Sequence, residues 1–161
     1  RNDSPGAMSV RVKGSTFTGT SCDFGGAIHS LNASLTLENS TFTGTLAVDG
    51  GAVLFAGSYS PAQSLVVKST TFTSTTANSI GGSIQVKSGD VTIDDSTFTD
   101  GESDIGECVW LDQCESYTES QIVKNTWNGC AKRGNPPISW CRQHDGNNWQ
   151  TCGMEGPVEC Y

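Results

Sequence analysis

The chain has 161 residues, a formal net charge of −8 at pH 7 and a hydrophobic fraction of 35%. Its length suits one domain, and its acidic balance disfavours nucleic acid and anionic membranes as partners, because both are themselves negative. No run of 18 apolar residues occurs, so the sequence predicts no membrane insertion. Residues 1–6 lack the apolar core of a signal peptide, which indicates a removed signal or a piece of a longer protein.

A motif of the type Ser-Thr-Phe-Thr recurs along the chain at intervals of 25 to 30 residues. Self-similarity with such a period is typical of a solenoid, a propeller or another repeat array. The aromatic positions of the successive copies are Phe17, Phe42, Phe72, Phe98 and Trp127.

Apolar pairs stand seven and five residues before each of the first four aromatics, and the fifth copy keeps one apolar residue at these places. Alternate residues of a strand share a face, so each pair is expected to point inward from one short strand. The aromatic lies an odd number of residues further on, so a bend must come between if it too is to point inward. The pairs are Val10 and Val12, Leu35 and Leu37, Leu65 and Val67, Val91 and Ile93, and Ser120 and Ile122; the bend residues are Gly14, Asn39, Ser69 and Asp95.

A third strand is predicted after each of the first four aromatics, following glycines such as Gly25-Gly26 and Gly50-Gly51. Paired glycines suggest a positive φ or a close backbone approach. Three short strands per period, with like residues stacked on like, predict an all-β chain that forms a parallel β-helix of about five coils over residues 8–129. The expected inward residues of the third strand are Ile28, Ser30, Val53, Phe55, Ile84, Val86, Val109 and Leu111.

One outward position, four residues before each aromatic, carries charges of alternating sign. Stacked coils would place these charges on neighbouring strands, where opposite signs attract. The residues are Lys13, Glu38, Lys68 and Asp94.

The Gly-Gly-Ala-[Ile/Leu/Val] motif at 25–28 and 50–53, with the Ser-x-Phe motif, resembles the repeats of chlamydial polymorphic outer-membrane proteins. More broadly it is similar to the right-handed β-helix repeats of large extracellular proteins. The resemblance covers about residues 8–129 and implies a right-handed parallel β-helix at the cell surface. The Asn that closes the family motif is replaced by Thr20, Thr45 and Thr75. Such coils serve adhesins, surface fibres and polysaccharide enzymes alike, so the resemblance specifies fold more than function.

Cysteine use is uneven, because Cys22 stands alone and six cysteines lie in the last third of the chain. No pair has zinc-ribbon or thioredoxin spacing, so disulfides in an oxidising compartment are predicted, with their pairing open. Cys22 is expected to be unpaired or bonded outside this chain. Residues 130–161 are interpreted as a Cys-rich C-terminal cap, with a small separate module as the alternative. The six clustered cysteines are Cys108, Cys114, Cys130, Cys141, Cys152 and Cys160.

Asn2, Asn32 and Asn39 begin N-glycosylation sequons, which would be used only in a eukaryotic secreted protein. The densest acidic stretch is interpreted as a solvated face, with a calcium site or acid–base catalysis as alternatives. The two histidines, His29 and His144, have no triad partners in sequence. The sequence therefore predicts no catalytic, cofactor or metal site. The acidic residues are Asp94, Asp95, Asp100, Glu102, Asp104 and Glu107.

The residues that flank each inward Phe are threonines and should face outward as a flat double file. This array resembles the ice-binding face of β-solenoid antifreeze proteins, although threonine is also an ordinary exposed strand residue. Trp110, expected to face outward, and Tyr59 could stack on sugars; packing against the cap would explain Trp110 equally well. The threonines are Thr16, Thr18, Thr41, Thr43, Thr71, Thr73, Thr97 and Thr99.

These patterns favour a non-catalytic, extracellular structural or adhesive module of a larger surface protein or filament. Its expected partners are other protein chains or surface glycans, and no cofactor is expected. The alternative is a β-helix carbohydrate-active enzyme or glycan-binding module, and the third hypothesis is ice binding through the outward threonines.

Overall fold

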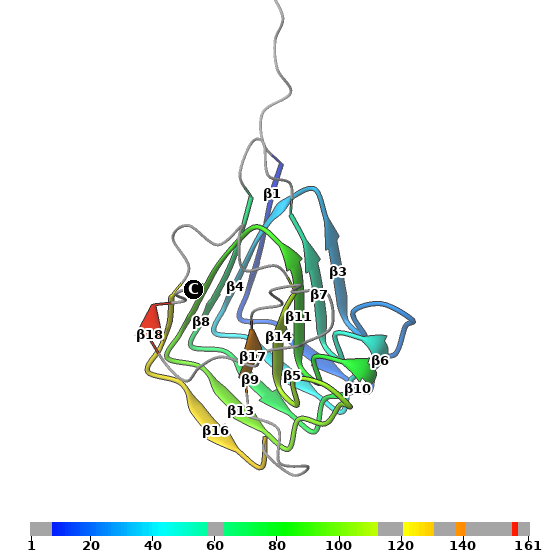
Figure 1. Cartoon of the computed structure of the whole chain (residues 1–161). Helices are drawn as coiled ribbons and strands as arrows, with labels where there is room; N and C mark the ends of the chain where they lie inside the picture. The colour runs from blue at the N-terminus through cyan, green and yellow to red at the C-terminus, as the bar shows by residue number, and fades with distance from the viewer. Residues whose placement is uncertain (1–7, 58–62, 113–120, 131–137, 141–155, 158–161) are drawn as a thin grey trace, which may run out of the picture.

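The computed structural model describes residues 8–57, 63–112, 121–130, 138–140 and 156–157. These residues form an all-β parallel solenoid, as predicted, with about four turns where about five coils were expected (Figure 1). Strands that are far apart in sequence lie side by side, and each coil repeats the path of the one before it. No helix that could cross a membrane occurs in the described ranges.

Three sheets run along the solenoid, and each takes one strand from every coil. The first sheet contains β1 (Ser9–Lys13), β4 (Ser34–Glu38), β8 (Ser64–Lys68), β12 (Asp90–Asp94), β15 (Gln121–Val123) and, antiparallel to β15, β18 (Gly156–Pro157). The threonine sheet contains β2 (Thr16–Thr18), β5 (Thr41–Thr43), β9 (Thr71–Thr73), β13 (Thr97–Thr99) and β16 (Thr126–Asn128). The third sheet contains β3 (Ile28–Leu31), β7 (Val53–Ala56), β11 (Ile84–Ser88), β14 (Val109–Leu111) and β17 (Ile138–Trp140).

A fourth, short sheet was not expected from the sequence. It pairs β6 (Leu46–Asp49) with β10 (Thr76–Ile80), and single bridges extend it to the first and fourth coils. Its register shifts between Ala77 and Ile80, so its alternation is interrupted. Because its pairing is irregular, the short sheet lacks the regular alternation that predicts a strand from sequence.

The predicted aromatic column is present in the core. The ring centroids of successive coils lie 4.8, 4.9, 4.8 and 4.4 Å apart, and the rings are nearly parallel. The three central rings, Phe42, Phe72 and Phe98, are completely buried, and the aliphatic pairs of the central coils pack beside them. The centroid spacing matches the distance between paired strands, so the rings repeat with the backbone.

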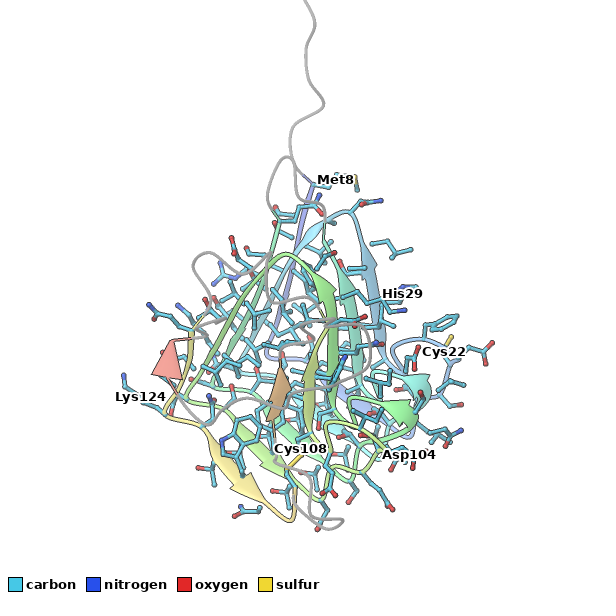
Figure 2. The ribbon with its side chains drawn as sticks, viewed as in Figure 1. Met8, Cys22, His29, Asp104, Cys108 and Lys124 are labelled. Atoms are coloured by element: carbon cyan, nitrogen blue, oxygen red, sulfur yellow. A yellow bond between two sulfur atoms is a disulfide. The ribbon has the colours of Figure 1, made fainter. Side chains whose placement is uncertain are left out.

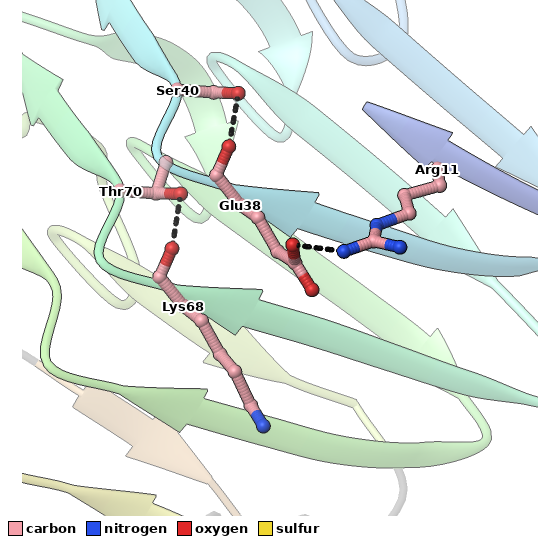
Figure 3. A network of polar contacts seen from close by, with 5 residues as sticks. All are labelled: Arg11, Glu38, Ser40, Lys68 and Thr70. Carbon is pink, nitrogen blue, oxygen red and sulfur yellow. Dashed lines mark hydrogen bonds and ion pairs between the residues drawn. The ribbon is translucent and has the colours of Figure 1, made fainter. Parts of the chain in front are cut away.

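The bend before each aromatic is built as predicted. Gly14, Asn39, Ser69 and Asp95 all have φ between 46° and 59°. A hydroxyl residue follows each bend; the Oγ of Ser40 donates to the carbonyl of Glu38, and the Oγ1 of Thr70 to that of Lys68 (Figure 3). Ser40 Oγ also accepts the N–H of Ser15 from the preceding coil. These side chains therefore satisfy backbone groups that the bend takes out of the ladder.

Both roles expected of the paired glycines occur. The first glycine of each pair, such as Gly50 with φ 63°, adopts the left-handed conformation. The second approaches the next coil so closely that a Cβ on Gly51 would collide with the carbonyl oxygen of Gly82. The corner after the short sheet therefore requires glycine for two separate reasons.

Replacing Phe72 with Ala should lower the free energy of unfolding by about 3–5 kcal/mol, because it opens a cavity in the middle of the ring column. Thr73→Ala, one residue away on the outer side, should change it by no more than about 0.5 kcal/mol. Urea denaturation monitored by circular dichroism measures both variants. Equal effects of the two substitutions would contradict the ring column as the main source of stability.

Candidate functional site

The outward threonines lie in two straight files across the threonine sheet. Phe42 pairs with Phe17 and Phe72 in register, so the threonines on either side of each ring pair in register too. Neighbours within a file are separated by one coil, about 4.8 Å, and the two files by two residues of strand, about 6.6 Å. The files are Thr16, Thr41, Thr71, Thr97 and Thr126, and Thr18, Thr43, Thr73, Thr99 and Asn128.

This threonine face combines regularity with rigidity. Every strand beneath it is paired with its neighbours, and the ring column lies directly behind. Threonine is stiff about χ1, so its hydroxyl and methyl groups lose little freedom when a partner binds. The structure thus brings together all eight threonines predicted as a surface and presents them as a flat lattice of hydroxyl and methyl groups.

Trp110 lies on the outer side of its sheet, as expected, but its ring is not exposed for stacking on sugars. Its side chain is only 7% exposed, although it alternates with the inward Val109 and Leu111 on β14. Alternation sets the side of the sheet on which a residue lies, but it does not decide whether solvent reaches that side. Tyr59, the other aromatic candidate, lies outside the described residues.

The acidic stretch is dispersed over several surfaces of the coil. Asp94 pairs with Lys68 on the neighbouring strand of the first sheet, and Asp95 accepts a hydrogen bond from Ser69 at a bend. Asp100 occupies the next corner with φ 52°, whereas Glu107 is buried in the paired-glycine position of the fourth coil. Within the described part of the chain, no three His, Cys, Asp or Glu residues are grouped in a way that could hold a metal ion.

The remaining acidic residues, Glu102 and Asp104, are exposed on the fourth coil. His29 is exposed on β3, with its ring centroid 5.9 Å from that of Phe24. His144 lies outside the described residues.

One disulfide, Cys108–Cys130, joins the fourth coil to the fifth. Cys108 takes the position that Ser83 holds in the coil before, and Cys130 belongs to the column of Thr75 and Gly101. In the third coil Thr75 and Ser83 are linked instead by a hydrogen bond of 2.6 Å. A Cβ on Gly101 would collide with the Sγ of Cys108, so this glycine makes room for the bridge.

The other cysteine and sequon predictions are only partly within the described chain. Cys22 is an exposed free thiol. Asn32 and Asn39 are exposed at bends, with φ of 53° and 48°, and their glycosylation stays a prediction. Asn2, Cys114, Cys141, Cys152 and Cys160 lie outside the described residues, as does most of the predicted cap 130–161.

The charge ladder on the first sheet has the predicted register. Lys13 and Lys68 flank Glu38 on the neighbouring strands. In addition, Arg11 reaches diagonally across to Glu38, with 2.5 Å between Nη2 and Oε2 (Figure 3). This hydrogen bond lowers the pKa of Glu38, and the positive charges of Arg11, Lys13 and Lys68 lower it further.

Comparison of the chain with protein-family models, curated proteins and solved structures finds no match.

The carboxyl of Glu38 should titrate below the ordinary range of a glutamate, and Arg11→Ala should raise its pKa. Because the folded pKa is the lower one, the stability that this group contributes is present above the unfolded-state pKa and is lost as the pH falls through the folded value. NMR titration of the side-chain carboxyl measures the shift. Lys87→Ala, on the third sheet, is the control and should leave the Glu38 pKa unchanged.

Gly101→Ala should destabilise the wild-type fold by about 1–3 kcal/mol, because the new methyl group overlaps Cys108 Sγ. In a Cys108→Ala/Cys130→Ala background the same substitution should have a smaller effect, because the sulfur is gone and the closest remaining approach is 2.9 Å, to the carbonyl oxygen of Glu107. A double-mutant cycle from denaturant unfolding measures the coupling. An identical loss in both backgrounds would contradict the spatial role of Gly101.

Proposed function

We propose that this chain is a non-catalytic, extracellular structural or adhesive module of a larger surface protein or filament. The observation that carries the proposal is the threonine face, in which two files of side chains repeat in register with the coils. A surface with a lattice period suits a partner that also repeats, such as a polysaccharide chain or another stacked sheet. Many weak contacts at matched spacing then add up without any deep pocket.

Two further features support an extracellular setting. The Cys108–Cys130 disulfide is of a kind that persists in oxidising compartments. The repeat motifs resemble those of chlamydial polymorphic outer-membrane proteins and of other right-handed β-helix surface proteins. Exposed sequon asparagines at 32 and 39 are compatible with glycans on the same molecule.

The proposed adhesive role predicts retention of the protein on insoluble polysaccharides such as cellulose or chitin particles, or self-association detected by light scattering. Thr43→Lys/Thr73→Lys should reduce retention or association at least about tenfold, because two long charged side chains break the flat lattice. Thr36→Lys/Thr92→Lys introduces the same change on the outer side of the first sheet and should have no such effect.

Equal behaviour of the two double variants would contradict a role for the threonine face. Release of soluble sugars from the particles would instead identify the chain as a carbohydrate-active enzyme.

Ice binding is a second candidate, and the spacing of the threonine face favours it specifically. Two rigid files of hydroxyl and methyl groups, about 4.8 Å apart along the solenoid and about 6.6 Å across it, could order water at a regular repeat. The wild-type chain should then show thermal hysteresis in a nanolitre osmometer. Thr43→Lys/Thr73→Lys should abolish it, and Thr36→Lys/Thr92→Lys should not. A wild-type chain without hysteresis would exclude this candidate.

A further inference from the structure

The large apolar side chains that remain exposed gather at two places in the described chain. Met8, Val10 and Leu31 belong to the first coil. The other four lie on and beside the short sheet, and we refer to them as the apolar patch. Its members are Phe24, Leu46, Val48 and Ile105, each 42–45% exposed.

Bridges of the short sheet bring the apolar patch together from three coils. Leu46 and Val48 are alternate residues of β6, so they share its outer face. Phe24 pairs with Asp49 at the end of β6, and Ile105 pairs with Ile80 at the end of β10. Phe24, Asp49, Ile80 and Ile105 therefore form one row across four coils, and Leu46 and Val48 lie beside this row on β6.

The core does not require these exposed residues. The inward positions of the short sheet are taken by Ala47 and Ala77, which are both buried. Leu46 and Val48 point to the opposite, outer side of β6. The corresponding outer positions of the threonine sheet are occupied by threonines. Polar residues would serve the fold equally well there, whereas apolar residues in a cluster are typical of an interaction surface.

The surroundings of the apolar patch are acidic. Asp23 and Asp104 directly precede Phe24 and Ile105, Glu102 pairs with Thr76 on β10, and all three acidic residues are exposed. Lys87, a nearby cation, lies 5.5 Å from the centroid of Phe24 and 3.9 Å from the Oδ2 of Asp49, so an acidic group already offsets its charge. Figure 2 shows Asp104 on the same side of the molecule as Cys22 and His29, beside β6 and β10, and opposite Lys124.

We propose that the apolar patch is a docking surface for a basic segment of another protein chain, one that carries apolar side chains between its lysines or arginines. The inference rests on the proposed adhesive function and names a protein partner for it. Apolar contacts at the centre and opposite charges at the rim are the usual composition of a specific interface. A second copy docked through the same patch would bring the acidic rims together, and this repulsion disfavours it. A glycan is disfavoured because three of the four residues are aliphatic, and sugars stack on aromatic rings.

Fluorescence anisotropy with labelled synthetic peptides tests the proposal on the whole chain. The probes are short peptides of alternating Leu and Lys, alternating Leu and Glu, and alternating Ser and Lys. The Leu/Lys peptide should bind at least about tenfold more tightly than either of the others, and added salt should weaken its binding. If the Ser/Lys peptide binds equally well, net charge alone explains the binding. If the Leu/Glu peptide binds equally well, apolar contact alone explains it. Either result overturns the proposal.

Variants locate the binding site. Leu46→Ser/Val48→Ser should weaken Leu/Lys binding at least about tenfold, whereas Leu31→Ser, an exposed leucine of the first coil, should leave it unchanged. Val48→Lys is a second variant that keeps bulk on β6 and should weaken the same peptide by repulsion. Unchanged binding in both patch variants would overturn the proposal. Thr43→Lys/Thr73→Lys should bind the peptide normally, so loss of function at the threonine face is distinguishable from loss at the apolar patch.

Discussion

The stacking of one aromatic ring per coil, at the spacing of paired strands, is the constraint on which the rest of the structure depends. The stacked rings are nearly parallel, and their centroid spacing of 4.8 Å equals the backbone repeat. Slipping any coil by one residue would turn its ring outward and its threonines inward. The column therefore fixes the register of every sheet, and each outer surface inherits its period from this buried one.

The inherited period explains why different outer faces are regular in different ways. On the threonine sheet it aligns hydroxyl and methyl groups, and on the first sheet it aligns Lys13, Glu38 and Lys68. Where one coil departs from the pattern, its neighbours adjust. The fourth coil carries Gly101 in place of an inward threonine, and the space is filled by the sulfur of Cys108. A change in one column is thus compensated in the adjacent one.

The sequence was sufficient to predict the columns, because like residues recur at like positions and the bends are marked by Gly, Asn, Ser and Asp. It was insufficient for features that depend on contact between columns. Cys108 and Cys130 come from different columns, and only the path of the coil shows that they are adjacent. Trp110 alternates as an outward residue, yet it is buried. Its burial could not be predicted, because alternation carries no information about what lies outside a sheet. The short sheet escaped prediction because its register shifts.

That irregular sheet is where sequence can change with least effect on the scaffold. It contributes only Ala47 and Ala77 to the interior, and single bridges rather than full strands connect it to the outer coils. Packing therefore constrains the identity of its outward residues much less than it constrains core residues such as Phe72 or Leu65. An apolar pair such as Leu46 and Val48 in that position is not explained by folding, since its exposure to water is unfavourable. Packing explains the ring column, which holds the coils in register, and the docking proposed above would explain the apolar side chains that the short sheet exposes.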